Sequence, residues 1–268
     1  MPFARKVLWI VDFDSNPNLF YGYLKSSGCN TACIRTRSSL LKPSIATFHQ
    51  IGIKVWGWRW PCVQPTNAPH AYAPEEAAFV AQELIPSGLD GYVVDPESDD
   101  DGAANDWNQK SVPDPHHPGQ HILLSQMAAD FCRTIKTAAQ GKPFHLGVTS
   151  GCGFPGPGQK TMLPWKEFIA AADSLYPQCY WRWRNAKNDL KEINGGSPDA
   201  AIKRALPAWT PVSQGKPIIP MAGEVNLVTA DEVHQYGRAL TAMNVSEADF
   251  YVGQPPVAPD VLATIKAL

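Results

Sequence analysis

The sequence lacks the marks of several protein classes. No uninterrupted apolar run approaches the ~20 residues that a membrane-spanning helix needs, so we expect no membrane span. The 23 Lys and Arg residues are outnumbered by 25 Asp and Glu residues, and the formal net charge of −2 leaves no basic excess of the kind typical of nucleic-acid binding. Disorder is excluded by the 44% hydrophobic content, which over 268 residues is enough for a large buried core.

Paired cysteine motifs are missing as well, and we expect no secretory leader. The six cysteines are scattered without a CxxC spacing, and in a chain of this size we expect reduced thiols rather than a disulfide framework. Arg5 and Lys6 precede an apolar stretch, but it covers only residues 7–11 before Asp12 interrupts it. That stretch is shorter than a typical secretory signal. We therefore interpret it as a first buried strand and expect a chain that is cytoplasmic as synthesised.

The sequence does contain a regular alternation of strand-like and helix-like stretches. Eight stretches rich in β-branched or aromatic residues are expected to be strands: 7–13, 31–36, 53–58, 91–95, 144–149, 178–181, 217–221 and 249–253. Eight amphipathic or alanine-rich stretches are expected to be helices: 19–27, 43–51, 74–84, 121–139, 164–172, 198–211, 229–243 and 259–268.

Eight alternating units, in a chain close to the ~250 residues typical of the class, predict an α/β fold of the TIM-type (β/α)8 barrel. An open doubly wound sheet is the alternative, but it would need a glycine-rich turn after the first strand, where the sequence reads DFDSNPNLF. We see no linker and expect a single barrel domain over residues 1–268. Long irregular loops are expected after strands four and six, at 98–120 and 182–197, on the side where barrel enzymes build their sites.

Acidic and aromatic residues gather where the expected strands end. The candidate site residues are Asp12, Arg35, Trp58, Trp60, Asp95, Glu97, Tyr180, Trp181, Glu224 and Gln254. Carboxylates for proton transfer, aromatic faces for stacking on sugar rings, and Arg or Gln for hydroxyl groups are typical of a carbohydrate site.

The segment GLDGYVVDPE, residues 88–97, carries most of this interpretation. Residues two apart in a strand point the same way, so Asp95 and Glu97 should share one face at the exit of the strand. Neighbouring carboxyl groups raise one another's pKa, which can keep one protonated as a general acid while the other stays ionised. In the alternative interpretation, Asp95 caps a loop amide and Glu97 is only solvated. The acids after strands one and seven favour the functional interpretation.

This layout resembles the glycoside hydrolase family 25 lysozymes and related barrel glycosidases. In those enzymes a first-strand Asp and a fourth-strand Asp-x-Glu line the site, and the Glu is the usual acid candidate. Asp12 matches the first-strand acid, and Asp95 and Glu97 match the pair. The lysozymes also carry an acidic residue near strand six, where this sequence has Tyr180-Trp181-Arg182. Glu224 after strand seven could substitute, as in other barrel glycosidases with a strand-four and strand-seven pair.

Other polar patterns are weaker evidence for a functional site. A metal site could be built from Asp114, His116, His117 and His121, but the prolines between them favour a solvated loop. The Asp run at 99–101 lacks the spacing of a calcium loop, and TSGCG at 149–153 does not fit the GxSxG nucleophile motif. We therefore expect no metal and no cofactor.

Taken together, these residues predict an enzyme, a barrel glycoside hydrolase that acts on a polysaccharide, with bacterial cell-wall glycan as the leading substrate. Glu97 is the expected general acid, and Asp95, Asp12 and Glu224 are candidates for its carboxylate partner. Trp58, Trp60, Tyr180 and Trp181 are the expected sugar platforms. A cell-wall substrate would require release or export by a leaderless route. The alternative is a catalytically silent barrel that binds glycan or a protein partner, which the missing strand-six acid favours; a metal-dependent hydrolase is a third possibility.

Overall fold

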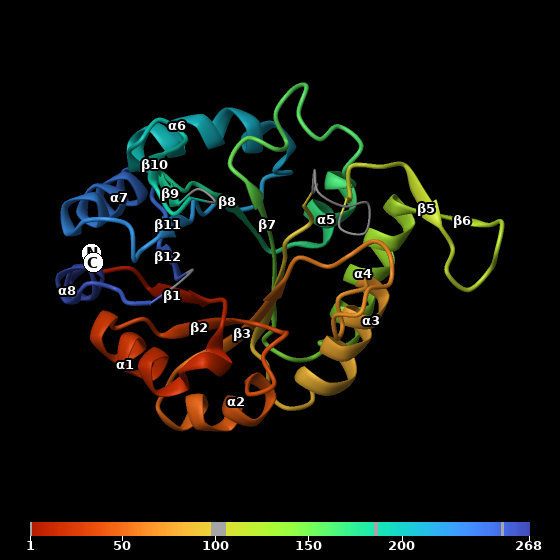
Figure 1. The fold of residues 1–268 in the computed structure, drawn as a ribbon, viewed down its shortest axis with the longest axis horizontal. Helices are drawn as coiled ribbons and strands as arrows, with labels where there is room; N and C mark the ends of the chain where they lie inside the picture. The colour runs from red at the N-terminus through yellow and green to blue at the C-terminus, as the bar shows by residue number, and fades with distance from the viewer. Residues whose placement is uncertain (1, 98–105, 185–186, 253–254) are drawn as a thin grey trace.

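The computed structural model describes residues 2–97, 106–184, 187–252 and 255–268. In these ranges, eight parallel strands form a barrel with eight α-helices around it (Figure 1). The barrel strands are β1 (Arg5–Ile10), β2 (Thr31–Arg35), β3 (Lys54–Arg59), β4 (Gly91–Val94), β7 (His145–Gly151), β8 (Ser174–Gln178), β11 (Ala222–Glu224) and β12 (Glu247–Val252). The helices are α1 (Pro17–Ser27), α2 (Leu41–Gln50), α3 (Ala73–Phe79), α4 (Leu124–Ala138), α5 (Trp165–Ala171), α6 (Pro198–Trp209), α7 (Ala230–Ala242) and α8 (Pro259–Ala267).

The sheet closes on itself in two places that join distant parts of the sequence. β1 lies between β2 and β12, and its first residue, Arg5, is in register with Glu247. β8 pairs with the segment before β11 through bridges from Leu175 to Ile218 and from Gln178 to Met221. The (β/α)8 prediction is therefore confirmed, and the open doubly wound sheet is excluded.

Alternation along the strands divides the core into two parts. On β1, Val7 and Trp9 point into the barrel, while Leu8 and Ile10 belong to the larger apolar layer between sheet and helices. This is the period of two expected of a strand that is buried on both faces. The barrel interior also holds a buried carboxyl group, because Trp9 Nε1 donates a hydrogen bond of 2.7 Å to Asp249.

Several helices begin with the start signals that their sequences carry. Asn16 accepts a hydrogen bond from the Leu19 amide and caps α1. Thr229 and Glu232 form a reciprocal capping box at the start of α7, which satisfies two otherwise unpaired amide groups. In the described residues, no helix is long and apolar enough to cross a membrane.

Two of the expected strands are displaced. The sixth strand, expected at 178–181, is β8 at Ser174–Gln178. The prediction was wrong because β8 contains Pro177, whereas the aromatic run that follows it has a more strand-like composition. The seventh, expected at 217–221, makes only isolated bridges there, and its strand is β11 at Ala222–Glu224.

The two loops expected to be irregular contain antiparallel hairpins. β5 (Ser111–Pro113) pairs with β6 (His121–Leu123), and this hairpin projects away from the barrel (Figure 1). Because β6 takes the residues from His121, α4 begins only at Leu124 rather than at 121. β9 (Arg182–Arg184) pairs with β10 (Leu190–Glu192) beside α6 and α7.

Candidate active site

The Asp-Pro-Glu segment directly follows β4. The Asp95 amide donates to the Arg59 carbonyl at 2.8 Å, which continues the β3–β4 pairing by one residue. The Asp95 side chain is 4% exposed, and Gln178 Nε2 donates to both of its carboxylate oxygens at 3.1 Å. Burial, and next the charge of Glu97, raise the pKa of Asp95 well above its usual value despite those hydrogen bonds. Asp95 therefore holds its proton tightly, and the charge of Glu97 contributes to this.

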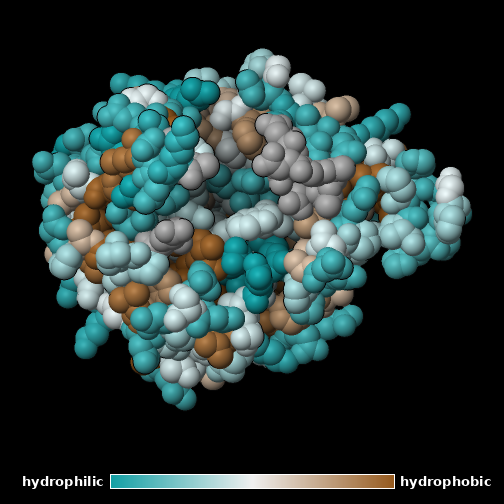
Figure 2. All heavy atoms as spheres, viewed as in Figure 1, coloured by the Kyte–Doolittle hydropathy of each residue, from teal (hydrophilic) through white to brown (hydrophobic). Residues whose placement is uncertain are grey.

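A third carboxyl group faces the same space. Asp95, Glu97 and Glu224 line one cavity of about 410 Å³, which we call the acidic cavity. Glu224 is the last residue of β11 and is partly buried. Burial raises its pKa, while the Arg184 charge opposes this. The acidic cavity thus contains three of the four acids that the sequence suggested. On the face of the molecule seen in Figure 2, the centre is hollowed and hydrophilic residues gather around the hollow.

The other walls of the acidic cavity are largely aromatic. Trp58 and Trp60 lie with their ring centroids 5.1 Å apart, and Tyr180 stacks on Tyr251 at 5.3 Å. Trp58 is 2% exposed and donates through Nε1 to the Ile10 carbonyl, so it forms the floor, whereas Trp60 is partly exposed. Flat apolar faces next to carboxyl groups are suited to binding sugar rings.

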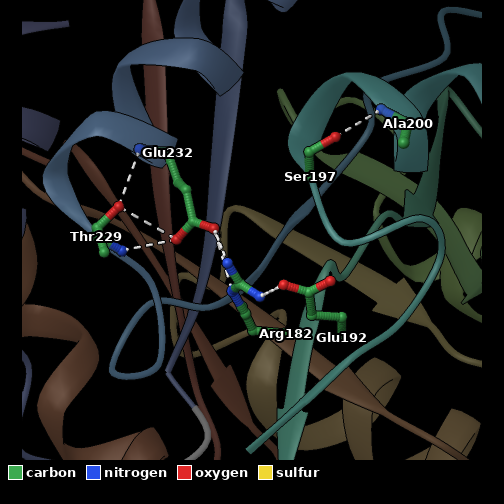
Figure 3. Close-up of polar contacts among 6 residues, drawn as sticks. All are labelled: Arg182, Glu192, Ser197, Ala200, Thr229 and Glu232. Atoms are coloured by element: carbon green, nitrogen blue, oxygen red, sulfur yellow. Dashed lines mark hydrogen bonds and ion pairs between the residues drawn. The ribbon is translucent and has the colours of Figure 1, made fainter.

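A hairpin supplies one wall of this cavity. Trp183 on β9, with 47% of its side chain exposed, lines the cavity together with Ile193, which follows β10. Figure 3 shows how the hairpin is fixed: Arg182 donates to Glu232 of α7 through Nε and Nη2, and to Glu192 of β10 through Nη1. The same Glu232 belongs to the α7 capping box, so one carboxylate joins the hairpin to the helix start.

Three of the predicted site residues lie elsewhere. Asp12 and Arg35 line a separate hollow of about 460 Å³, because the chain turns away after β1 to bury Phe13. Arg35 reaches toward the acidic cavity only by lying over the Trp60 ring, 5.2 Å from its centroid. Trp181 is fully buried and packs 6.0 Å from Tyr236 of α7, because it points to the side opposite Tyr180. Gln254 lies outside the described residues.

Seven lining residues of the acidic cavity were not among the predicted ones: Trp9, Thr149, Gln178, Trp183, Ile193, Met221 and Tyr251. Gln178 and Trp9 show why. The sequence predicts Gln178 as the first residue of a strand, whereas it is the last residue of β8 and therefore reaches the cavity. Trp9 also lines the cavity from β1. Its position two residues after Val7 in an alternating strand was the available signal, because both side chains must face the barrel axis.

The described residues contain no group of three or more His, Cys, Asp or Glu side chains placed to hold a metal ion. In the loop between β5 and β6, Asp114 instead contacts His117 Nδ1 at 2.9 Å and accepts from the His116 amide at 2.8 Å. These contacts stabilise the turn itself.

No protein-family model matches the sequence, and no curated protein is similar enough in sequence to count as a relative. Solved structures do resemble the chain. A GH18 chitinase from Pseudoalteromonas aurantia shares 10% identity, with 98% of each chain covered and a TM-score of 0.59. The spore cortex-lytic enzyme SleL from Bacillus cereus has a TM-score of 0.62 at 7% identity, covering 97% of this chain and 73% of its own. The PgaB glycoside hydrolase domain from Bordetella bronchiseptica has a TM-score of 0.58 at 9% identity, covering 93% of this chain and 94% of its own.

The chain has the (β/α)8 barrel fold that these three structures share. These likenesses support the general part of the predicted resemblance. They do not single out the family 25 lysozymes, and that narrower resemblance stays a prediction.

Proposed function

We propose that this protein is a glycoside hydrolase that cleaves a polysaccharide, with bacterial cell-wall glycan as its leading substrate. The observation that carries the proposal is the acidic cavity, which Asp95, Glu97 and Glu224 line together with aromatic residues at the carboxyl ends of the strands. Most glycoside hydrolases use two carboxyl groups on either side of the scissile bond. The cell-wall substrate is supported by one structural neighbour that is described as a spore cortex-lytic enzyme.

In the proposed reaction, Glu97 donates its proton to the glycosidic oxygen as the bond from that oxygen to the anomeric carbon breaks. A second carboxylate either accepts a proton from the attacking water or forms the new bond to the anomeric carbon, which water later hydrolyses. Glu224 and Asp95 line the same cavity and are the candidates for this role. The raised pKa of Asp95 favours Glu224, because the role requires an ionised group. Asp12 is the weaker candidate because it lines a different hollow. Two carboxyl groups suffice for this chemistry, so the mechanism requires no cofactor.

The test is turnover of purified cell walls, followed by loss of turbidity, beside a panel of soluble polysaccharides. Glu97→Gln keeps the shape of the side chain but removes the transferable proton, so we expect activity to fall by ~100-fold or more. Wild-type turnover and an unchanged pH profile in this variant would end the assignment of Glu97. If the wild-type chain binds glycans but cleaves none, the chain is the silent binding barrel instead.

A further inference from the structure

A second cavity adjoins the acidic cavity. It has a volume of about 510 Å³ and lies between the end of β7 and α6. Gln178, Tyr180 and Ile193 line both cavities, so the two share a wall and together form a longer binding surface. Among the described residues that line it, Arg204 alone is charged, so we call it the Arg204 cavity.

The two cavities differ in charge. Three carboxyl groups line the acidic cavity, whereas the described lining of the Arg204 cavity contains no carboxyl group. In the described part of the chain, no carboxylate makes an ion pair with Arg204. A guanidinium in such a place is available to bind an anion through two parallel hydrogen bonds.

The position of Arg204 is fixed relative to the strand ends. Its helix, α6, is capped by Ser197, which accepts from the Ala200 amide (Figure 3). Two further bonds join this helix to the residue after β7: the Cys152 thiol donates to the Ala201 carbonyl at 3.3 Å, and Trp209 Nε1 donates to the Cys152 carbonyl at 3.0 Å. The helix that carries the cation is therefore held against the rim of the barrel.

The remaining walls are suited to a sugar. Phe154 offers an aromatic face, and Gln159 and Asn194 contribute amide groups. Asn194 is held in place because its Nδ2 donates to the Tyr180 carbonyl at 2.8 Å. An aromatic ring with a few fixed polar groups is the usual composition of a carbohydrate subsite.

We infer that the Arg204 cavity is a sugar subsite that selects a glycan unit bearing a carboxylate, bound by the Arg204 guanidinium. This inference rests on the proposed function and narrows its substrate class to acidic glycans. The charges of the two cavities also determine how the glycan is oriented across them. The carboxylate-bearing unit binds at Arg204, and a neighbouring unit without charge lies over Asp95 and Glu97, because the reverse placement would bring like charges together.

The experiment measures binding by calorimetry to the Glu97→Gln chain, which retains the cavities but not the proposed acid. The acidic probe is peptide-free peptidoglycan glycan strands, whose lactyl groups carry free carboxylates. The neutral probe is the same strands after amidation, and oligogalacturonate is a second acidic glycan. We expect amidation to weaken binding by about 10-fold, as for the loss of a charge-assisted hydrogen bond. High salt should reduce the difference.

Arg204→Gln in the same background should bind both forms of the strands equally, and Arg204→Lys should recover part of the preference. Lys203→Gln is the matched control, because Lys203 is the neighbouring cation on α6, is exposed as Arg204 is, and does not line the cavity. Tighter binding of oligogalacturonate than of the strands supports the subsite and assigns it to uronic acids. Equal binding of acidic and amidated strands, or equal losses in Arg204→Gln and Lys203→Gln, overturns the inference.

The proposed function is decided separately, by turnover of the wild-type chain. Hydrolysis of neutral and acidic glycans alike supports the proposed function but overturns the subsite. Carboxylate-dependent binding without hydrolysis of any polysaccharide supports the subsite and overturns the proposed function.

Discussion

A buried carboxyl group beneath α3 should make stability depend on pH. The Glu76 side chain is fully buried between α3 and the sheet, and Oε1 accepts from the hydroxyl groups of Thr36 and Tyr92. Its other oxygen, Oε2, is buried and has no hydrogen-bond partner among the described residues, and the same holds for Nη1 of Arg59. Burial raises the pKa of Glu76 from 4.5 to about 7, although Thr36, Arg59 and Tyr92 oppose the shift.

The sign and size of the effect follow from linkage. The folded chain holds the Glu76 proton more tightly than the unfolded chain, so this contribution to stability is fully present below pH 4.5 and is lost as pH rises toward about 7. Since one pKa unit corresponds to about 1.4 kcal/mol, the loss at pH 8 is on the order of 3 kcal/mol. Glu76→Gln keeps the acceptor oxygen but cannot ionise. We therefore expect this variant to gain about 3 kcal/mol relative to wild type between pH 4.5 and pH 8.

The assay is urea unfolding of both chains at a series of pH values, and the quantity of interest is the difference in free energy of unfolding between them. Other buried acids, such as Asp249, titrate in both chains and cancel in this difference. A difference that stays constant from pH 4.5 to pH 8, or that grows toward low pH, would refute the reasoning. Such a result would mean that Glu76 is already ionised in the folded chain.

Three further outcomes are expected. Of Asp95→Asn and Glu224→Gln, one should reduce hydrolysis severely, by ~100-fold or more, and recover activity with azide; Asp12→Asn should have a mild effect, and full activity in all three would exclude a two-carboxylate mechanism. Trp60→Ala should weaken glycan binding with little change in melting temperature, whereas Trp181→Ala should cost ~3–5 kcal/mol of stability as a core truncation; the opposite pattern would exchange their roles. Arg182→Gln should raise KM more than it lowers kcat, because it releases the hairpin that carries Trp183, while the exposed Lys191→Gln on the same hairpin should match wild type; equal KM values in both would show that the hairpin does not contribute to binding.

The predictable part of the site is the part that follows uninterrupted apolar strands. Gly91–Val94 is fully buried, so the point at which the chain becomes polar marks the strand exit and places Asp95 and Glu97 correctly beside it. Trp58 follows from the same reasoning on β3, where five consecutive residues are buried. In a parallel strand covered on both faces, composition alone locates the end.

The rest depended on local geometry that composition does not encode. Pro177 makes β8 look unlike a strand, so the sequence predicts the strand over the aromatic run at 178–181 instead. This shift gives wrong positions to both Gln178 and Trp181. Asp12 lies only two residues after β1, but a short turn buries Phe13 and directs the acid into another hollow. The hairpin that brings Trp183 to the acidic cavity depends on Arg182 meeting Glu232, two residues separated by 50 positions in the sequence. Such pairs become visible only once the helices are placed.

The pairing of β1 with β12 has a consequence for how the chain folds. It joins Arg5 to Glu247, so the ring closes only after a loop of about 240 residues has been brought together. Contacts so distant in sequence are entropically costly to form and slow the search for the native topology. Trp9 of β1 and Tyr251 of β12 both line the acidic cavity, and they become neighbours only on closure. The acidic cavity is therefore complete only when the first and the last strand of the barrel have paired.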